Sequence, residues 1–292
     1  MKVFIASGEK YVDKIQEDIY IRDMFRNKGF AVEILTLDKI VEEAVSNDLV
    51  ILKSIWGYHK DSDKFLHQLS ILKNRSVRLV NDFPFIHWNI DKSSYLAEIN
   101  FLNIIPTQTI NLSHYSTIQE IKTAIENKVS ETSGDLFIIK PSISASGFLT
   151  FLYQKNSNDG DLFSTFLNNK NLNFLIQPFR PQIKGGEISI IAIHGKLLYG
   201  IRRFPGVVSL SQNPEYLDIE NIPRDIVETV ENLLGFLKNK FSSFPLISRI
   251  DFVKNESMHE LMEIELIDPD LFFKYVPQNI LEKSLSELYL NI

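Results

Sequence analysis

Two consecutive apolar stretches near the C-terminus carry charged residues at alternate positions. The first contains Arg249 and Asp251, and the second contains Glu263 and Glu265. In a β-strand, side chains repeat every two residues, so each charged pair shares one face of its strand. The short polar connection, residues 254–258, suits a hairpin that brings both charged faces together. The pattern therefore predicts an antiparallel pair of strands with three carboxylates and an arginine on one side.

Clustered carboxylates of this kind repel one another unless something neutralises them. A hard divalent cation, Mg²⁺ or Mn²⁺, is the usual partner, and its small octahedral shell commonly includes phosphate oxygens of a nucleotide. The alternative interpretation is an ordinary solvated sheet face, because a half-buried antiparallel strand shows the same alternation of charged and apolar residues.

The composition describes a globular protein with substantial cores. The chain has 292 residues, 44% hydrophobic content and no cysteine, which excludes disulfides, thiolate catalysis and cysteine-bound zinc. The net charge of −6, without a basic stretch interleaved with aromatic residues, argues against a nucleic-acid partner. No apolar run approaches the roughly 20 residues that a membrane-spanning helix needs, so we expect no membrane segment and a cytoplasmic location.

The order of patterns along the chain predicts an α/β protein with several lobes. Up to about residue 82, short apolar runs alternate with amphipathic stretches, as in a parallel sheet with crossover helices. Asp91 is a candidate N-cap for a helix from Lys92 to about Leu102. A second small α/β lobe follows, and from Phe148 onward strands dominate, with His194-Gly195 as a tight turn between two of them. Two amphipathic stretches, residues 224–240 and 281–290, predict the last helices.

Small residues and hydroxyls follow an apolar strand that ends in Lys140. Such a loop brings backbone N–H groups and serine hydroxyls close to phosphates, and the lysine adds positive charge. The candidate residues of the loop are Ser142, Ser144, Ser146 and Gly147. The spacing is not that of a P-loop, and an ordinary serine-rich connection would look the same.

Further candidates lie at the ends of predicted strands. The residues Gln177, Pro178 and Phe179 end a strand with a proline, which leaves main-chain groups available to an adenine edge. Glu187 follows two glycines and suits ribose hydroxyls, although an exposed loop glutamate is the simpler interpretation. Arg203 ends another strand, where its guanidinium suits carboxylate or phosphoryl oxygens. Lys92 is a cation in the first turn of its helix, where the helix dipole disfavours positive charge.

Six short motifs occur in order along the chain: Trp88-Asn89-Ile90-Asp91-Lys92, Ile139-Lys140-Pro141, Gln177-Pro178-Phe179, Gly186-Glu187-Ile188-Ser189, Arg249-Ile250-Asp251 and Met262-Glu263-Ile264-Glu265. Together they resemble the ATP-grasp superfamily. The chain is most similar to the branch with glutathione synthetase and RimK-like ligases, and within it to the D-cycloserine-forming type of ATP-grasp ligase. The resemblance spans about residues 48–273.

The resemblance implies a three-lobed ATP-grasp fold with an N-terminal parallel α/β lobe that binds substrate (1–82), a small central lobe (83–178) and a C-terminal antiparallel-sheet lobe (179–292). It implies an enzyme, an ATP-dependent carboxylate-amine ligase that forms an amide through an acylphosphate on small amino-acid-like substrates. ATP and Mg²⁺ or Mn²⁺ are the implied cofactors, and a small-molecule acid and amine are the implied partners. Homo-oligomerisation stays open.

The resemblance also implies roles for individual residues. Asp251, Glu263 and Glu265 would hold the metal, and Arg249 and Arg203 would act on the reacting groups. Phosphates would be bound by Lys92 and Lys140 and covered by the loop that contains Ser142, Ser144, Ser146 and Gly147. The adenine would be framed by Gln177, Pro178 and Phe179, and the ribose would be held by Glu187.

One departure from the cycloserine-type pattern concerns the segment Pro205-Gly206-Val207-Val208-Ser209-Leu210-Ser211-Gln212. Relatives of that type carry an acid and an arginine there, and this chain has neither. The departure leaves open a different acceptor or a catalytically weakened nucleotide-binding module. A further alternative is an ATP-dependent kinase of a small metabolite, because the same phosphate-binding groups would serve a hydroxyl acceptor.

Overall fold

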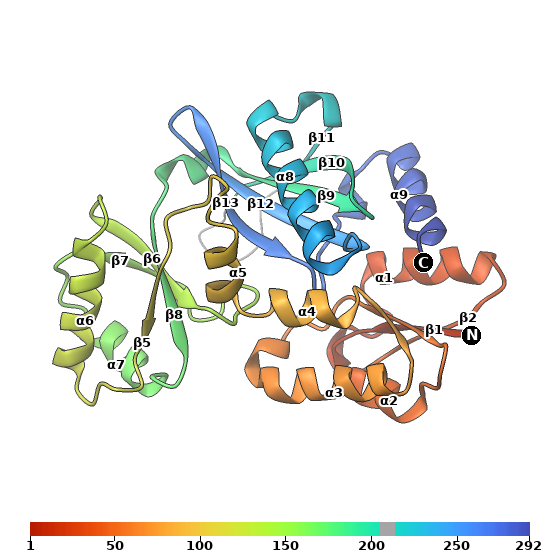
Figure 1. Cartoon of the computed structure of the whole chain (residues 1–292), viewed down its shortest axis with the longest axis horizontal. Coiled ribbons are helices and arrows are strands. Elements are labelled where there is room, and N and C mark those ends of the chain that lie inside the picture. The colour runs from red at the N-terminus through yellow and green to blue at the C-terminus, as the bar shows by residue number, and fades with distance from the viewer. Residues whose placement is uncertain (205–213) are drawn as a thin grey trace. The chain divides into compact units, whose positions relative to one another are not determined.

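A computed structural model describes residues 1–204 and 214–292, so the segment Pro205–Gln212 singled out above lies outside the described residues. The described chain forms two compact units (Figure 1). The first combines residues 1–90 with 182–292, and the second comprises residues 91–181. The three-lobe boundaries at residues 82 and 178 stay a prediction.

The N-terminal part of the first unit is a four-stranded parallel sheet with strand order β2-β1-β3-β4. Its central strands β1 and β3 are almost entirely buried, which explains their unbroken apolar sequences. The predicted parallel α/β lobe is confirmed. Its elements are β1 (Lys2–Ala6), η1 (Glu9–Tyr11), α1 (Gln16–Asn27), β2 (Ala31–Leu35), α2 (Leu37–Glu43), β3 (Leu49–Leu52), η2 (Tyr58–Asp61), α3 (Ser62–Asn74), β4 (Arg78–Val80) and α4 (Phe83–Asn89).

The C-terminal part of the same unit is an antiparallel sheet with strand order β11-β10-β9-β12-β13. The predicted hairpin of β12 and β13 is confirmed, and His194 and Gly195 make the turn between β9 and β10 with positive φ angles of 47° and 78°. The elements are η3 (Pro181–Gly185), β9 (Glu187–Ile193), β10 (Lys196–Arg203), β11 (Glu215–Leu217), η4 (Ile219–Asn221), α8 (Arg224–Phe241), β12 (Ile247–Asn255), β13 (Met258–Glu265), η5 (Phe273–Tyr275) and α9 (Gln278–Leu290).

A single hydrophobic core joins the two sheets of this unit. Val3 and Ile5 of β1 belong to the same buried cluster as Ile191 of β9 and Tyr199 of β10. Helix α9 packs on α1, and the hydroxyl of Tyr199 donates a hydrogen bond of 2.6 Å to the carbonyl of Leu271. The antiparallel sheet is therefore built onto the parallel one rather than tethered to it by a linker.

The second unit is a four-stranded antiparallel sheet, order β5-β8-β6-β7, with its own core. Helices α6 and α7 pack together beside it (Figure 1). Thr117 and Glu120 form a capping box that starts α6. The elements are α5 (Lys92–Glu98), β5 (Gln108–Asn111), α6 (Ile118–Ser130), β6 (Leu136–Pro141), β7 (Phe151–Gln154), α7 (Gly160–Asn168) and β8 (Asn173–Pro178).

Some local expectations need correction. Helix α5 ends at Glu98, earlier than the predicted Leu102, although Asp91 caps it as expected by accepting from the Ser93 amide. Helix α7 lies in a region where strands were predicted to dominate.

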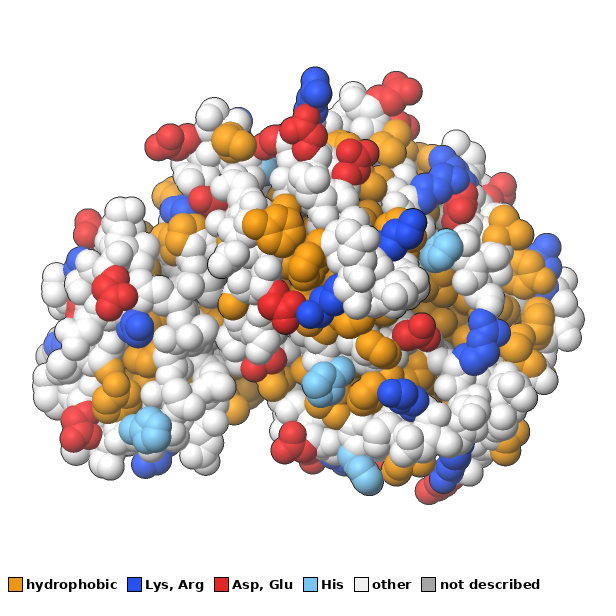
Figure 2. Space-filling view, viewed as in Figure 1, with side chains coloured by type: hydrophobic (Ala, Val, Ile, Leu, Met, Phe, Trp, Pro, Cys, Tyr) orange, Lys and Arg blue, Asp and Glu red, His pale blue; other side chains and the backbone are white. Residues whose placement is uncertain are grey.

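In the described residues, no helix combines the length and hydropathy required to cross a bilayer. On the face shown in Figure 2, acidic and basic side chains are both scattered among uncharged and hydrophobic ones.

Candidate active site

Charged side chains of four neighbouring strands meet on one face of the antiparallel sheet. In the hairpin, Asp251 lies opposite Glu263 and Arg249 lies opposite Glu265. Across β9 and β10, Glu187 lies opposite Arg203. Residues directly opposite in an antiparallel pair point to the same side of the sheet. We call this group the carboxylate–arginine face; its members are Glu187, Arg203, Arg249, Asp251, Glu263 and Glu265.

Asp251 has polar partners at both of its carboxylate oxygens. Its Oδ1 accepts from Ser189 Oγ at 2.6 Å and from Arg249 Nε at 3.1 Å. Its Oδ2 lies 3.0 Å from Arg203 Nη2. Only 4% of the residue surface is exposed, so these partners replace the water that an ionised carboxylate would otherwise bind.

Arg203 bridges two carboxylates of the face. Its Nη2 lies 2.8 Å from Glu187 Oε1 as well as 3.0 Å from Asp251 Oδ2. The guanidinium also stacks over the ring of Phe272, with 5.4 Å between its central carbon and the ring centroid. A planar, weakly hydrated guanidinium makes both kinds of contact at once, which an ammonium does not.

The two arginines keep the face charged. Burial disfavours the ionised form of Asp251, but Arg249 and Arg203 outweigh it and lower its pKa. Burial likewise opposes the charge of Arg249, and the carboxylates of Asp251, Glu265 and Glu263 outweigh it and raise its pKa. For Glu187 burial prevails over Arg203, and its pKa is raised. Asp251 therefore stays ionised in a largely dry environment.

The donor chemistry of the face fits a hard divalent cation. Asp251, Glu263 and Glu265 offer carboxylate oxygens from adjacent strands, which are the ligands that Mg²⁺ and Mn²⁺ prefer. In the described residues, however, no three acidic, histidine or cysteine side chains are already arranged as a metal site. Arginine nitrogens surround Asp251 instead, so metal binding would require this carboxylate to exchange arginine contacts for the ion.

Gly186 allows the chain to enter β9 next to the arginines. Its φ is +96°, in the region that favours glycine, and an added Cβ would lie 2.7 Å from the Cγ of Arg202. A side chain here would therefore displace β10 or strain the backbone. Gly186 is thus a structural requirement for placing the Glu187 carboxylate at the strand start, whereas an added Cβ at Gly185 would meet nothing within 4 Å.

Two buried asparagines fasten the strands of the face to the N-terminal part of the unit. Asn89 donates to the Ile264 carbonyl at 2.9 Å and accepts from the Leu266 amide at 2.8 Å. Asn81 bonds both the amide and the carbonyl of Ile247. Sequence reasoning gave neither asparagine a role, nor Ser189. For Asn89 the signal was its place in the Trp-Asn-x-Asp-Lys motif.

In the second unit, Lys92 and the serine loop lie together. Lys92 begins α5 and is only 5% exposed, and its Nζ donates to the carbonyl of Ser144 at 2.6 Å. Its amide donates to the Ser142 carbonyl at 3.0 Å. Both serines are buried, and Ser144 Oγ donates to the carbonyl of Pro141. The side chain and the backbone amide of Lys92 therefore both bind backbone carbonyls at the start of the loop.

The other candidates of this unit occupy β6, β8 and the loop. Lys140 lies near the end of β6, opposite Leu175 of β8. Ser146 and Gly147 both have positive φ, 52° and 71°, so the backbone reverses at this point of the loop. Gln177 and Pro178 end β8, and the Gln177 side chain donates to Thr107 Oγ1 at 2.8 Å. One expectation is wrong: the Phe179 amide is not left available after the proline, because it donates to the Leu136 carbonyl at 2.8 Å.

A second cluster of buried charge lies in the N-terminal part of the first unit and was missed by sequence reasoning. Lys53, which follows β3, forms an ion pair with Glu17 of α1 and donates to the Pro269 carbonyl. Glu17 in turn accepts from the amides of Leu271 and Phe273. Asp18 accepts from Ser54 Oγ at 3.0 Å. We call Glu17, Asp18 and Lys53 the lysine cluster.

The lysine cluster shares one cation between two acids. Burial raises the pKa of Glu17 to about 7, and the charge of Lys53 only partly offsets it. Burial likewise raises the pKa of Asp18 to about 6. Burial opposes the charge of Lys53, but both carboxylates outweigh it and raise its pKa. The cluster ties α1 and β3 to the segment after β13.

The same arrangement of elements occurs in solved structures, and it is the ATP-grasp fold. The crystal structure of D-cycloserine synthetase DcsG superposes with a TM-score of 0.79 at 16% identity, over 99% of both chains. A RimK domain ATP-grasp protein from Sphaerobacter thermophilus gives 0.65 at 12% identity, over 100% of this chain and 98% of that one.

A further solved structure and a sequence-family match add to these similarities. D-alanine–D-alanine ligase from Bacillus anthracis, solved with ATP, gives a TM-score of 0.64 at 15% identity over 99% of this chain and 94% of the other. Residues 3–81 match the sequence family described as "D-cycloserine synthetase DcsG, N-terminal domain". No curated protein matches the chain in sequence. The predicted fold is thereby confirmed, and the sequence family covers the N-terminal part.

Proposed function

We propose that the protein is an ATP-dependent carboxylate-amine ligase that joins a small amino-acid-like acid to an amine. The observation that carries this proposal is the carboxylate–arginine face, where an ionised, buried aspartate is held between two arginines next to further carboxylates. A preorganised group of charges in a dry site stabilises charge that develops during a reaction, usually the largest contribution to catalysis.

In this proposal Asp251, Glu263 and Glu265 hold Mg²⁺ or Mn²⁺, which would offset the negative charge of ATP phosphates and favour phosphoryl transfer to the substrate carboxylate. Their oxygen donors on adjacent strands support the assignment. Arg203, stacked on Phe272, would orient the carboxylate or phosphoryl group. Arg249 would stabilise negative charge on the acylphosphate and on the tetrahedral intermediate that the amine forms.

For the second unit we propose nucleotide binding. Lys92 and Lys140 would contact phosphates, with Ser142, Ser144, Ser146 and Gly147 covering them, and Gln177, Pro178 and Phe179 would bind adenine. Glu187 of the first unit would bind ribose. The position of the Lys92 side chain at the loop, where its Nζ donates to the Ser144 carbonyl, supports this assignment, because it places an ammonium beside the backbone that would cover the phosphates.

The named activities of the structural neighbours support the reaction class. They include a D-cycloserine synthetase, a D-alanine–D-alanine ligase and the ATP-grasp ligase PsnB, the last solved with a minimal precursor, Mg and ADP. A small-molecule acid and a small-molecule amine are the proposed partners. A cytoplasmic location is proposed with the ligase.

The test is an assay of ADP release over a panel of amino acids and small amines. Asp251→Asn and Glu263→Gln keep the side-chain size but remove a charge, and we expect each to lower turnover about 100-fold or more. Asp225→Asn is the matched control, since Asp225, at the start of α8, pairs with His259 and is no part of the face. Substrate-dependent turnover that survives both face substitutions would contradict the metal assignment.

The product distinguishes the ligase from the alternatives. A mass increase of a phosphoryl group on a metabolite would indicate a kinase, whereas an amide indicates the ligase. Mg-ATP binding, seen as thermal stabilisation, without ADP release for any acceptor would indicate a nucleotide-binding module.

A further inference from the structure

The segment between β13 and η5 connects the lysine cluster with the carboxylate–arginine face. Glu17 of the cluster accepts hydrogen bonds from the backbone amides of Leu271, at 3.0 Å, and Phe273, at 3.4 Å. Phe272 lies between these two residues, and the guanidinium of Arg203 lies over its ring. The cluster and the face are therefore joined through a single residue, Phe272.

The backbone of Phe272 has an unfavourable conformation that its surroundings hold in place. Its φ is 57° and its ψ is 32°, in the left-handed region, where a bulky residue persists only if neighbouring groups determine the conformation. The Phe272 amide donates to Asp270 Oδ1 at 2.8 Å, and its carbonyl accepts from the Tyr275 amide at 2.8 Å. The Tyr199 hydroxyl donates to the Leu271 carbonyl at 2.6 Å. Hydrogen bonds thus fix the backbone on both sides of the ring.

Lys53 supports the same segment at a second point. Its ammonium pairs with Glu17 and donates to the Pro269 carbonyl, three residues before Phe272. Phe272 itself is 7% exposed and belongs to the hydrophobic core that joins the two sheets. The position of its ring is therefore determined by the core and by the lysine cluster together.

The contacts of Arg203 differ in whether a ligand would compete for them. Its Nη2 lies 2.8 Å from Glu187 Oε1 and 3.0 Å from Asp251 Oδ2. In the proposed ligase Glu187 would bind ribose and Asp251 would bind a metal ion, so ligands compete for both carboxylates. The Phe272 ring, 5.4 Å from the central guanidinium carbon, has no such competitor. Stacking also leaves the N–H groups of an arginine available to carboxylate or phosphoryl oxygens.

We propose that Phe272 is a positioning residue for Arg203. Glu17 holds the backbone on both sides of Phe272, and the ring keeps the guanidinium in place when ligands engage Asp251 and Glu187. The lysine cluster thereby acts on the carboxylate–arginine face through one aromatic side chain. The consequence for catalysis rests on the proposed ligase function, whereas the fixed position of the guanidinium is measured without it.

The first test measures the mobility of Arg203 in the full chain without nucleotide. Side-chain ¹⁵N relaxation gives the order parameter of Arg203 Nε, whose signal is assigned by its loss in Arg203→Lys. Asp251→Ala removes one carboxylate, as its engagement by a metal would, and we expect Arg203 Nε to stay ordered. Adding Phe272→Leu should lower the order parameter below about 0.6, and adding Phe272→Tyr, which keeps a ring, should not. Adding Glu17→Ala instead should lower it less than Phe272→Leu does.

Phe273→Leu is the matched control for this test. Phe273 is 2% exposed and belongs to the same core, but among the described residues its ring makes no cation–π contact with Arg203. In the Asp251→Ala background it should therefore leave Arg203 Nε ordered, although it also removes a buried ring.

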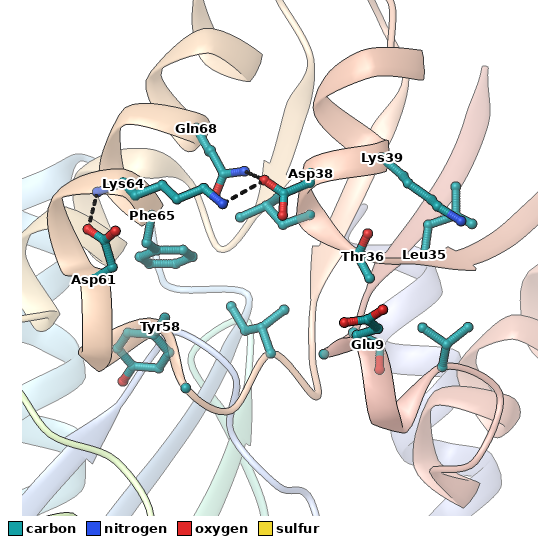
Figure 3. Close-up of a pocket in the computed structure, with 16 residues that line it drawn as sticks. Glu9, Leu35, Thr36, Asp38, Lys39, Tyr58, Asp61, Lys64, Phe65 and Gln68 are labelled. Carbon is teal, nitrogen blue, oxygen red and sulfur yellow. Dashed lines mark hydrogen bonds and ion pairs between the residues drawn. The ribbon is translucent and has the colours of Figure 1, made fainter.

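Lys64→Met is the control for the loss of a charge elsewhere in the same unit. Lys64 lies 2.9 Å from Asp38 in a pocket of about 670 Å³ at the carboxyl edge of the parallel sheet (Figure 3). The residues that line this pocket include neither Phe272 nor Glu17. We expect this variant to leave the order parameter of Arg203 Nε unchanged.

The proposal is overturned if Arg203 Nε becomes mobile in Asp251→Ala while Phe272 is intact, or if it stays ordered after Phe272→Leu is added. An unchanged order parameter in the Glu17→Ala variant overturns the part assigned to the lysine cluster. Urea unfolding establishes that each variant is folded. Phe272→Met replaces Phe272→Leu, and Glu187→Ala replaces Asp251→Ala, if either variant does not fold.

The second test is kinetic and uses an acid that the ligase assay has identified. Phe272→Leu should raise the KM for this acid about tenfold and leave the KM for ATP unchanged, with Phe272→Tyr within about twofold of the unaltered chain. A smaller folded fraction would lower kcat alone, so an unchanged KM for the acid overturns the role in the reaction. If no acid is turned over, the ligase proposal fails, and the relaxation measurement still decides whether Phe272 fixes Arg203.

Discussion

The carboxylate–arginine face and the lysine cluster both bury charge within the first unit, but they balance it in opposite ways. In the face, two arginines converge on Asp251 and lower its pKa. In the cluster, one lysine serves two acids, and burial raises the pKa of Glu17 to about 7 and that of Asp18 to about 6. An acid with two cations beside it stays ionised, whereas two buried acids that share one cation favour a proton.

The two regions also differ in what their hydrogen bonds hold. Side chains of the face bond mainly to one another across neighbouring strands, so their charged groups gather on one side of the sheet. The lysine cluster bonds backbone groups, namely the Pro269 carbonyl and the Leu271 and Phe273 amides. We infer that the face serves chemistry and that the cluster serves the attachment of the segment after β13.

Lys53→Met gives the largest expected effect on this comparison. The substitution keeps the apolar stem but leaves the buried acids without their cation, and we expect a loss of about 3–5 kcal/mol in the free energy of unfolding by urea. Lys196→Met is the control, because Lys196 pairs with Glu287 at the surface and should cost about 0–1 kcal/mol.

Adding Glu17→Gln to Lys53→Met should restore part of the lost stability, since one uncompensated charge is removed. Equal losses for Lys53→Met and Lys196→Met would mean that the cluster contributes no more than a surface ion pair, and the contrast between the two regions would then fail.

The pH dependence of stability gives the next effect. Glu17 has an ordinary pKa of 4.5 and a folded-state pKa of about 7, so between these values the folded protein keeps a proton that the unfolded chain has released. The contribution of Glu17 to stability therefore falls as pH rises from about 4.5 to about 7, by up to about 3 kcal/mol. Because Asp18 also has a raised pKa and stays in the variant, the measurement is the difference in unfolding free energy between the unaltered chain and Glu17→Gln, by urea at pH 5, 6, 7 and 8. We expect this difference to fall from pH 5 to 7 and to level off above pH 7.

Glu120→Gln provides the control with the opposite sign. Backbone hydrogen bonds from Ser116 and Thr117 lower the pKa of Glu120, so its contribution is present above pH 4.5 and is lost as pH falls below that. Its difference curve should be flat from pH 5 to 8. A flat difference curve between the unaltered chain and Glu17→Gln over the same range would show that Glu17 titrates in the folded protein as it does in the unfolded chain.

The sequence predicted the face better than the cluster for a physical reason. A period of two fixes which residues of a strand share a side, so the strand pattern alone places Arg249 and Asp251 with Glu263 and Glu265. The apolar runs of β1 and β3 likewise predicted a buried parallel sheet. Features that depend only on residues close together in the sequence can therefore be predicted without knowing how distant segments pack.

Contacts between distant segments could not be predicted in the same way. Glu17 and Lys53 lie in different elements, far apart in the chain, and neither has a neighbour in sequence that indicates a partner. Asn89 stood in a recognised motif, but its bonds to Ile264 and Leu266 depend on how α4 meets β13. Helix α7 was missed because it is short and begins with glycine after a polar stretch, which weakens the helical pattern.

Ser189→Ala gives the smallest expected effect and the sharpest test of the face. The Ser189 hydroxyl is fully buried and donates to Asp251 Oδ1 at 2.6 Å, so it fixes the rotamer of a carboxylate that two arginines also approach. Its loss removes one hydrogen bond to a charged group, worth about 1.5–3 kcal/mol. Because the arginines remain, we expect turnover to fall about tenfold, with a smaller fall for Ser189→Thr, which keeps the hydroxyl.

Ser248→Ala is the matched control for this last substitution. Ser248 is equally buried on β12 next to Arg249, but its hydroxyl donates to the Ala192 carbonyl at 3.4 Å, on the opposite side of the strand. We expect it to leave turnover unchanged and to cost about 0.5–1.5 kcal/mol of stability, because this hydrogen bond joins two neutral groups. If both variants lower turnover equally, Ser189 acts only through the stability of the sheet; if only Ser189→Ala does, the position of the Asp251 carboxylate governs the reaction.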